Sequence, residues 1–277
     1  MQCVPNFSEG RDDSILQTLA NTITASAVRL VDWSADVDHN RSVFTFVGSP
    51  ANIIETSVCL ARMAVQMIDL NSHTGVHPRI GVLDVLPVVP LANVTMDECS
   101  STARTIAWRL SKELSLPVFF YDFASESFHT LPAVRKGAFK TMQPDSGPNV
   151  PHKTAGAVAV GARDPLVAFN VNLNGGTLKD AKRIAQLVRI RFDGGVRALG
   201  LYLTSKDVHQ VSMNIIRTRD VTLSDVVQYI GNYAEILDTE LIGAMPGYAA
   251  FSTIKSALRL AQIRPDQVLL ENWPREH

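Results

Sequence analysis

The sequence has few cysteines and no excess of charge of either sign. Its 277 residues include three cysteines, Cys3, Cys59 and Cys99, which form neither an even disulfide framework nor a closely spaced zinc-binding pair. This usage is typical of a reducing compartment, and we expect a cytoplasmic protein. The 26 lysines and arginines are balanced by 27 aspartates and glutamates. No field of one sign would draw the chain onto a polyanion, so we expect no nucleic-acid partner.

Long hydrophobic runs are also missing. The most apolar window, residues 80–94, is shorter than the roughly 20 residues of a membrane span and is interrupted by Asp84, Pro87 and Pro90. Residues 1–13 contain charged side chains and a proline where a signal peptide needs an uninterrupted apolar core. We therefore expect neither export nor a membrane partner.

The chain does have enough apolar residues for a large core. Hydrophobic residues make up 46% of the sequence. Because single cores rarely grow beyond about 250–300 residues, the length favours two domains, which we assign to residues 1–150 and 151–277. Residues 141–154, between the halves, contain three prolines and one glycine. This segment is either a linker or a binding loop.

Hydrophobic periodicity gives both halves the same order of elements. In the first half we expect strands at 2–6, 27–34, 42–48, 82–89 and 117–121, with helices around 15–23, at 51–70 and from 95. In the second half we expect strands at 166–173, 196–203, 208–215, 240–244 and 267–270, with helices at 178–191, 223–237 and 248–261. Each half reads βαββαβ plus an additional αβ. This order predicts an α+β protein of two ferredoxin-like subdomains, whose sheets face each other across a ligand cleft.

The densest group of reactive side chains lies in residues 71–81, between a predicted helix and a predicted strand. His73 and His77 have the spacing of two metal ligands on a helix, but Gly75 and Pro78 disfavour that helix, and no adjacent glutamate supplies a base. We therefore expect no metal site. Loops of this kind often carry function, which favours a functional role for one of the two histidines.

Two other polar groups are candidates for a binding site. Residues 36–41 lie in the bend between two predicted strands, where a solvated hairpin turn is an equally good interpretation. Asn170 and Asn172 alternate along a predicted strand and so share one face. Burying two amides is costly unless something bonds them. We favour a polar cleft over hydrogen bonds to neighbouring backbone.

Four motifs together carry a resemblance to a known family. They are Val-Pro-Asn-Phe-Ser-Glu-Gly-Arg at 4–11, Asp-His-Asn-Arg-Ser-Val-Phe-Thr-Phe-Val-Gly at 38–48, Gly-Val-His-Pro-Arg-Ile-Gly at 75–81 with Asp84, Pro87 and Pro90 after it, and Ala-Phe-Asn-Val-Asn-Leu at 168–173. In these motifs the chain resembles the glutamate formiminotransferase family, from residue 2 to about residue 250, in the form without a cyclodeaminase domain. Val76 and Val88 depart from the family pattern, and neither change removes a reactive group.

The resemblance implies a transferase that moves the formimino group from N-formimino-L-glutamate to N5 of tetrahydrofolate, in histidine degradation. It also implies a homodimer with tetrahydrofolate as co-substrate and no metal. The family's catalytic histidine corresponds to His77, and its folate-contacting segment to about residues 147–156. The predicted substrate-binding residues are Asp38, His39, Asn40, Arg41, Arg79, Gly147, Pro148, Asn149, Val150, Pro151, Asn170 and Asn172.

Elementary chemistry agrees with a histidine in this role. The donor is an amidine, electrophilic at carbon, and the tetrahedral carbon formed by attack of N5 expels an amine only when that amine is protonated. An imidazole, with a pKa of about 6.5, can take the proton from N5 and return it to the departing glutamate nitrogen. We expect Arg41 and Arg79 to hold substrate carboxylates, and Asp38 to offset the amidinium charge.

Three alternatives remain open at the level of sequence. The same histidine could serve a folate-dependent glutamate formyltransferase. A non-catalytic folate-binding protein would bind folate without turnover, and its folate binding would not change when His77 is replaced by alanine. A metal-dependent hydrolase using Asp38, His39, His73 and His77 would lose its activity when a chelator is added.

Overall fold

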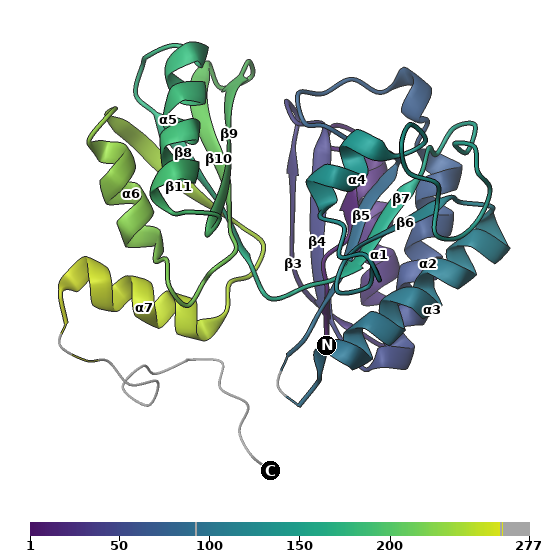
Figure 1. Ribbon diagram of the computed structural model, residues 1–277. Helices are drawn as coiled ribbons and strands as arrows, with labels where there is room; N and C mark the ends of the chain where they lie inside the picture. Colours follow the sequence, from purple (N-terminus) through teal and green to yellow (C-terminus); the bar gives the residue numbers. More distant parts are fainter. Residues whose placement is uncertain (92, 261, 263–277) are drawn as a thin grey trace. The chain divides into compact units, whose positions relative to one another are not determined.

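The computed structural model describes residues 1–91, 93–260 and 262, which form two compact units (Figure 1). The first unit is built on residues 1–165 and the second on residues from 166 onward. Each has its own β-sheet, seven-stranded in the first unit and four-stranded in the second, so the chain is mixed α/β. None of the helices in these described ranges is long and apolar enough to cross a membrane.

The sheet of the first unit joins an antiparallel part to a parallel part. Its strands are β1 (Gln2–Cys3), β2 (Asn6–Phe7), β3 (Arg29–Asp36), β4 (Arg41–Val47), β5 (Leu83–Val89), β6 (Val118–Asp122) and β7 (Val158–Ala162). Strands β1 and β2 follow one another between β4 and β5, and β3 pairs with β4 on the outer side. On the other side of β5, strand β7 pairs in parallel with both β5 and β6. Asn6, Arg41 and Asp84 therefore come from three neighbouring strands.

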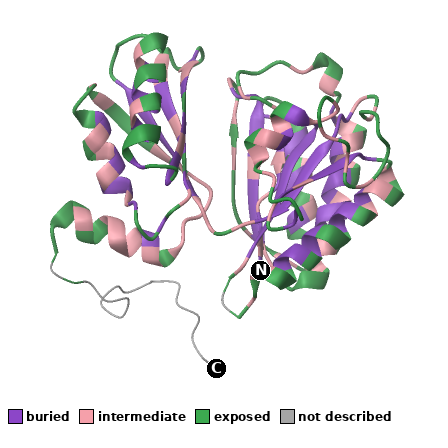
Figure 2. Cartoon of the chain, viewed as in Figure 1, coloured by how far each residue is buried: buried purple, intermediate pink, exposed green. Residues whose placement is uncertain are grey.

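Helices cover both faces of this sheet. They are α1 (Asp13–Thr24), α2 (Pro50–Met67), α3 (Met96–Leu114) and α4 (Leu131–Gly137), with a short 3-10 helix, η1 (Leu70–Ser72). The first three α-helices bury their apolar stripes in the larger core, which Val118 of β6 also joins. Phe119 and Tyr121, the alternate residues of β6, pack instead with Val134 of α4. With both faces covered, every residue of β5 is buried (Figure 2).

The second unit follows the order βαββαβ and ends in one further helix. Its elements are β8 (Val167–Leu173), α5 (Leu178–Arg191), β9 (Val196–Leu203), β10 (Val208–Ile215), α6 (Leu223–Gly231), β11 (Ile236–Ile242) and α7 (Gly247–Leu258). The strands lie in the order β11-β8-β10-β9. Ile184 of α5 and Val226 of α6 share a core with Val171 of β8 and Val211 of β10. Both helices therefore cover the same face of the sheet.

The element order is confirmed over most of the described chain, with two differences in element bounds and two additional elements. The helix predicted at 223–237 ends at Gly231, and β11 begins at Ile236, before the predicted strand at 240–244. Helix α4 and strand β7 were not predicted. Helix α4 has only seven residues, and β7 (Val-Ala-Val-Gly-Ala) is short and rich in small residues, so neither has a clear periodicity. The predicted strand at 267–270 lies outside the described residues.

The boundary between the units also differs from the sequence prediction. We expected it after residue 150, whereas the first unit continues to Pro165. The physical reason is strand β7, which lies between β5 and β6 and so ties residues 158–162 into the first sheet. The proline-rich segment before β7 is held there as well, since Leu70 donates a backbone hydrogen bond to Thr154 and Val118 donates one to Ser146.

Candidate active site

A buried carboxylate, Asp84, lies at the centre of the polar groups in the first unit. It is fully inaccessible to solvent, and its Oδ2 accepts hydrogen bonds from Arg41 at 2.7 Å and from Arg135 at 2.5 Å. The Ile80 backbone N–H donates to Oδ1 at 2.7 Å. Burial would raise the pKa of Asp84, but the two guanidinium groups and this amide outweigh it and hold the pKa at about 2. Asp84 is therefore an anion that bridges two arginines.

The Arg41 side chain bonds to other protein groups and so has a structural role in the site. It is the first residue of β4 and is only 7% exposed. Besides its ion pair with Asp84, it donates from Nη2 to Asn6 Oδ1 at 2.9 Å. Asn6 in turn donates to the Val4 carbonyl at 2.8 Å. Both ends of this guanidinium are thus used within the protein.

Arg135, by contrast, retains unused hydrogen-bonding capacity. It extends from α4 to Asp84, and its side chain is 18% exposed. Its Nε is buried, and no residue in the described part of the chain accepts a hydrogen bond from it. The sequence analysis did not identify Arg135, because it belongs to none of the motifs and its helix was not predicted. An arginine paired at one end and open at the other can bind an incoming anion.

His77 is an uncharged imidazole in this arrangement. Burial, together with Arg41 and Arg135, lowers its pKa to about 2, against the opposing effect of Asp84. Its Nδ1 lies 2.7 Å from the Pro78 carbonyl. Because a carbonyl can only accept, the proton is on Nδ1, and the lone pair is on Nε2. Nε2 has no hydrogen-bond partner among the described residues, so His77 presents a free base nitrogen.

Arg79 fixes the loop that carries His77. It donates to the backbone carbonyls of His39, Asn40 and His77 at 2.8–3.2 Å and contacts the His73 ring. We expected Arg79 to hold a substrate carboxylate, but in the structure its donors face these protein groups. The contacts join the loop to the β3–β4 turn and place the His39 and His77 rings with centroids 5.8 Å apart.

Asn40 and Gly75 complete the connection between the two loops. The Asn40 side chain accepts a hydrogen bond from the Gly10 amide and donates one to the Thr74 carbonyl, both at 2.9 Å. Gly75 lies so close to this turn that a Cβ there would be 2.4 Å from the His39 carbonyl oxygen. The structure therefore brings together the first three sequence motifs, at residues 4–11, 38–48 and 75–81.

The predicted folate segment adjoins the same loop at one end. Residues 147–151 are exposed, whereas Gly156 forms an isolated β-bridge with Gly81. Backbone hydrogen bonds join Ala157 to Ile80 at 2.9 Å and Val82 to Ala155 at 3.0 Å. A Cβ on Gly81 would lie 1.8 Å from the Ala157 carbonyl oxygen, so only glycine permits this approach.

Of the remaining predicted residues, Asp38 adjoins the His77 loop, and the two asparagines lie in the second unit. Asp38 lies in the β3–β4 turn, half-buried, and its carbonyl accepts a hydrogen bond from Val76. Asn170 and Asn172 belong to β8 of the second unit, where both are buried. Within residues 1–91, 93–260 and 262, no three His, Cys, Asp or Glu side chains are arranged to hold a metal ion.

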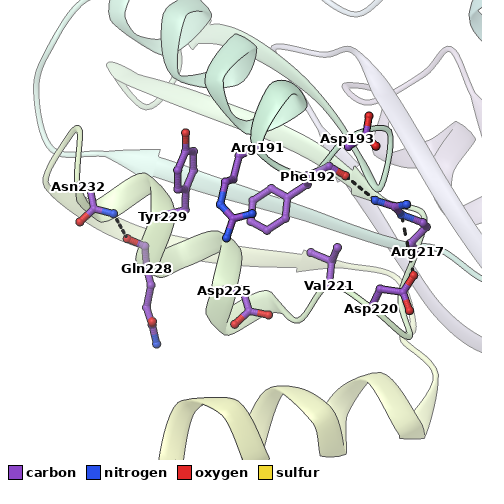
Figure 3. Close-up of a pocket in the computed structure, with 10 residues that line it drawn as sticks. All are labelled: Arg191, Phe192, Asp193, Arg217, Asp220, Val221, Asp225, Gln228, Tyr229 and Asn232. Atoms are coloured by element: carbon purple, nitrogen blue, oxygen red, sulfur yellow. Dashed lines mark hydrogen bonds and ion pairs between the residues drawn. The ribbon is translucent and has the colours of Figure 1, made fainter.

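A separate pocket in the second unit holds none of the predicted site residues (Figure 3). It is lined from α5, α6 and the segments that follow α5 and β10. Arg217 donates to the Phe192 carbonyl at 2.9 Å and lies 4.0 Å from Asp220. Arg217 and Asp220 thus interact with each other, and the lining of this pocket contains no histidine.

Comparison with known proteins assigns the chain to a family. Residues 1–163 match the family model described as the formiminotransferase domain, N-terminal subdomain. The glutamate formimidoyltransferase of Streptococcus pyogenes serotype M1 is 36% identical over 293 residues, which cover 98% of this chain and 97% of that protein. Its counterpart in Thermoplasma acidophilum is 34% identical over 282 residues, 94% of this chain and 92% of that protein.

A third relative is about twice as long. The formimidoyltransferase-cyclodeaminase of Gallus gallus is 37% identical over 264 residues, which cover 88% of this chain but 49% of that protein. The chain thus spans about half of this longer protein and nearly all of the two shorter ones. On the match of its first 163 residues and the identity along almost its whole length, the chain belongs to the formiminotransferase family.

Proposed function

We propose that the protein is a glutamate formimidoyltransferase, which transfers the formimino group from N-formimino-L-glutamate to N5 of tetrahydrofolate. The observation that carries this proposal is the near full-length similarity to proteins of that name. Tetrahydrofolate is then the co-substrate, and the reaction belongs to one-carbon metabolism and histidine degradation. We expect no metal ion to take part.

We propose that His77 carries the proton between the two substrates. N5 attacks the amidine carbon, a C–N bond forms, and the N5 proton passes to His77 Nε2. The tetrahedral carbon then collapses, the C–N bond to glutamate breaks, and the imidazolium returns the proton to the leaving nitrogen. The free lone pair on Nε2 and the donor hydrogen bond from Nδ1 support this assignment.

The low pKa of His77 in the unliganded protein suggests how the substrate activates it. Two of the influences that lower this pKa are the positive charges of Arg41 and Arg135. A substrate carboxylate bound beside Arg135 would oppose that field and raise the pKa of His77 toward its ordinary value of about 6.5. His77 becomes a competent base only after the anionic substrate is bound, because the negative charge of the substrate raises its pKa.

We therefore propose Arg135 as the residue that binds a substrate carboxylate, and Arg79 as a positioning residue for the His77 loop. Arg41 stays in its ion pair with Asp84. Replacing Arg135 by glutamine should raise KM for formiminoglutamate by about tenfold or more, since a charge-assisted hydrogen bond of roughly 1.5–3 kcal/mol is lost. Steady-state kinetics measure this effect.

The matched control is Lys136→Gln, which removes one positive charge from the exposed neighbouring position of α4. It should leave KM within twofold. Equal changes in the two variants would mean that only the long-range field matters, and would contradict a direct contact by Arg135.

We further propose that both units are ferredoxin-like subdomains. The order βαββαβ with strands β11-β8-β10-β9 supports this for the second unit, and strands β3-β4-β1/β2-β5 give the first unit an equivalent antiparallel core. The extra strands β6 and β7 extend that core. The facing sheets, the cleft between them, the homodimer and the cytoplasmic location stay predictions.

The experiment that tests the function is a comparison of two donors. Purified protein is incubated with tetrahydrofolate and either N-formimino-L-glutamate or N-formyl-L-glutamate, and the 5-substituted folate is measured. We expect turnover with the formimino donor. Turnover with the formyl donor alone would identify the formyltransferase, and folate binding without turnover of either donor would identify a binding protein.

A further inference from the structure

Helix α3 lies on the outside of the first unit and has one face that packs against nothing in that unit (Figure 1). Its inward side chains, among them Ile106 and Leu110, are buried in the core. The outward stripe is exposed along the whole helix. Its spacing, i, i+4, i+7, i+8, i+11 and i+15, is that of a single helix face. This stripe, which we call the α3 face, consists of Asp97, Ser101, Arg104, Thr105, Trp108 and Lys112.

Trp108 belongs to a cluster of aromatic side chains at the surface. It is 56% exposed, and Phe123 and Phe128 are 42% and 65% exposed. The two phenylalanine rings meet edge to face with centroids 5.8 Å apart. The Ser100 hydroxyl donates to the Phe123 carbonyl at 3.1 Å, which holds this pair beside α3. Trp108, Phe123 and Ser101 line one hollow of about 540 Å³. Large apolar side chains gathered at a surface mark an interaction site.

The α3 face carries charges of opposite sign at its two ends. Asp97 lies in the first turn of the helix and Lys112 in the last turn. Neither forms an ion pair with another residue in the described part of the chain, and the Lys112 ammonium lies over the Trp108 ring, 4.5 Å from its centroid. Arg104, in the middle, donates to the Ala124 carbonyl at 3.2 Å. The face is therefore complementary in charge to a second copy of itself that runs in the opposite direction.

The spacing along α3 fits one antiparallel register. With a two-fold axis between Arg104 and Thr105, Asp97 of one copy faces Lys112 of the other, and Ser101 faces Trp108. Helices that cross at about 20° keep such pairs close along their length. The small side chain of Ser101 leaves room for the opposite indole, which then enters the hollow beside Phe123. Each of these contacts occurs twice, because a two-fold interface uses the same surface on both copies.

We propose that the α3 face is the interface of a homodimer, in which Trp108 of each copy occupies the hollow of the other. A tryptophan desolvated at the centre of an interface commonly supplies much of the binding energy. The pairs between Asp97 and Lys112 lie at the two ends of the contact, where complementary charges fix the register of the partners. This interface is independent of the reaction at His77.

Sedimentation velocity of the full chain over a range of concentrations measures the dimer Kd. We expect a dimer for the wild-type protein. Trp108→Glu places a charge in each hollow and should raise the dimer Kd at least a hundredfold. The matched control is Ile190→Glu, which introduces the same charge at a position of α5 that is 68% exposed, and it should leave Kd within twofold. A monomeric wild-type protein, or a Trp108→Glu variant that dimerises as tightly as the wild type, would overturn the proposal.

An exchange of charges tests the antiparallel register. Asp97→Lys and Lys112→Asp each bring like charges together at both ends of the interface, and each should raise the dimer Kd at least tenfold. In an equimolar mixture of the two variants, one copy carries two lysines and the other two aspartates, so every pair is again attractive. The mixture should therefore recover the wild-type Kd. A mixture that dimerises no better than either variant alone would overturn the proposed register, and unchanged far-UV circular dichroism shows that both variants are folded.

Discussion

His77→Ala should lower kcat by roughly a hundredfold to ten-thousandfold, the usual contribution of a general acid–base group. The imidazole is the only group we assign to both proton transfers, and alanine leaves neither a base for N5 nor an acid for the glutamate nitrogen. Binding of 5-formyltetrahydrofolate and the thermal unfolding midpoint should change little, because the His77 side chain is half-buried on a loop. Stopped-time product assays at saturating substrate measure the loss.

His129→Ala is the matched control for this substitution. His129 is half-buried in the same unit, and the hydrogen bonds found for it are made by its backbone. Its replacement should leave kcat within twofold. A His77→Ala variant with wild-type kcat would remove His77 from the mechanism.

Asp84→Asn should produce the largest loss of stability. The substitution keeps the shape of the side chain but leaves Arg41 buried without its counter-charge, and removing one member of a buried ion pair costs about 3–5 kcal/mol. Arg135 loses its anchor as well. We expect the free energy of unfolding, measured by urea titration, to fall by this amount. We expect the enzymatic activity to fall as well.

Glu113→Gln serves as the comparison, since Glu113 pairs with Arg62 and Arg109 at the surface. Exposed pairs contribute little because water screens them, so its urea midpoint should barely move. Adding Arg41→Met to Asp84→Asn should recover part of the lost stability, because the uncompensated cation is then removed. A stable Asp84→Asn protein would show that the three-residue cluster does not hold the site together.

The sequence could predict those site residues that lie within one uninterrupted motif. His77 follows Gly75 and Val76 in such a motif, and the structure finds it beside His39 and within the field of Arg41. Asp84 was noted as an interruption of an apolar window and as part of the third motif, but no role was predicted for it. Its role depends on strand pairing, because β2, β4 and β5 must first lie side by side before Asn6, Arg41 and Asp84 can meet.

The contact between Arg135 and Asp84 could not be predicted from the sequence for a related reason. Its helix is seven residues long, too short for a clear hydrophobic period, and it is separated from Asp84 by 51 positions. Asn170 and Asn172 were predicted to share a face from their alternation along one strand. Their hydrogen-bond partners on that face, Gln210, Asp238 and Glu240, were not predicted. A strand's own pattern identifies the face on which its residues lie, whereas their partners come from β10 and β11, whose pairing only the fold determines.

Long-range 1H–15N correlation spectra of the wild-type protein, recorded from pH 5 to pH 8, test directly whether His77 is an uncharged base; the His77→Gln spectrum assigns its signals. We predict the neutral form with hydrogen on Nδ1 throughout this range in the free protein, and a rise in its pKa when formiminoglutamate binds. A His77 signal that titrates near pH 6.5 without ligand, or that carries its proton on Nε2, would contradict the mechanism.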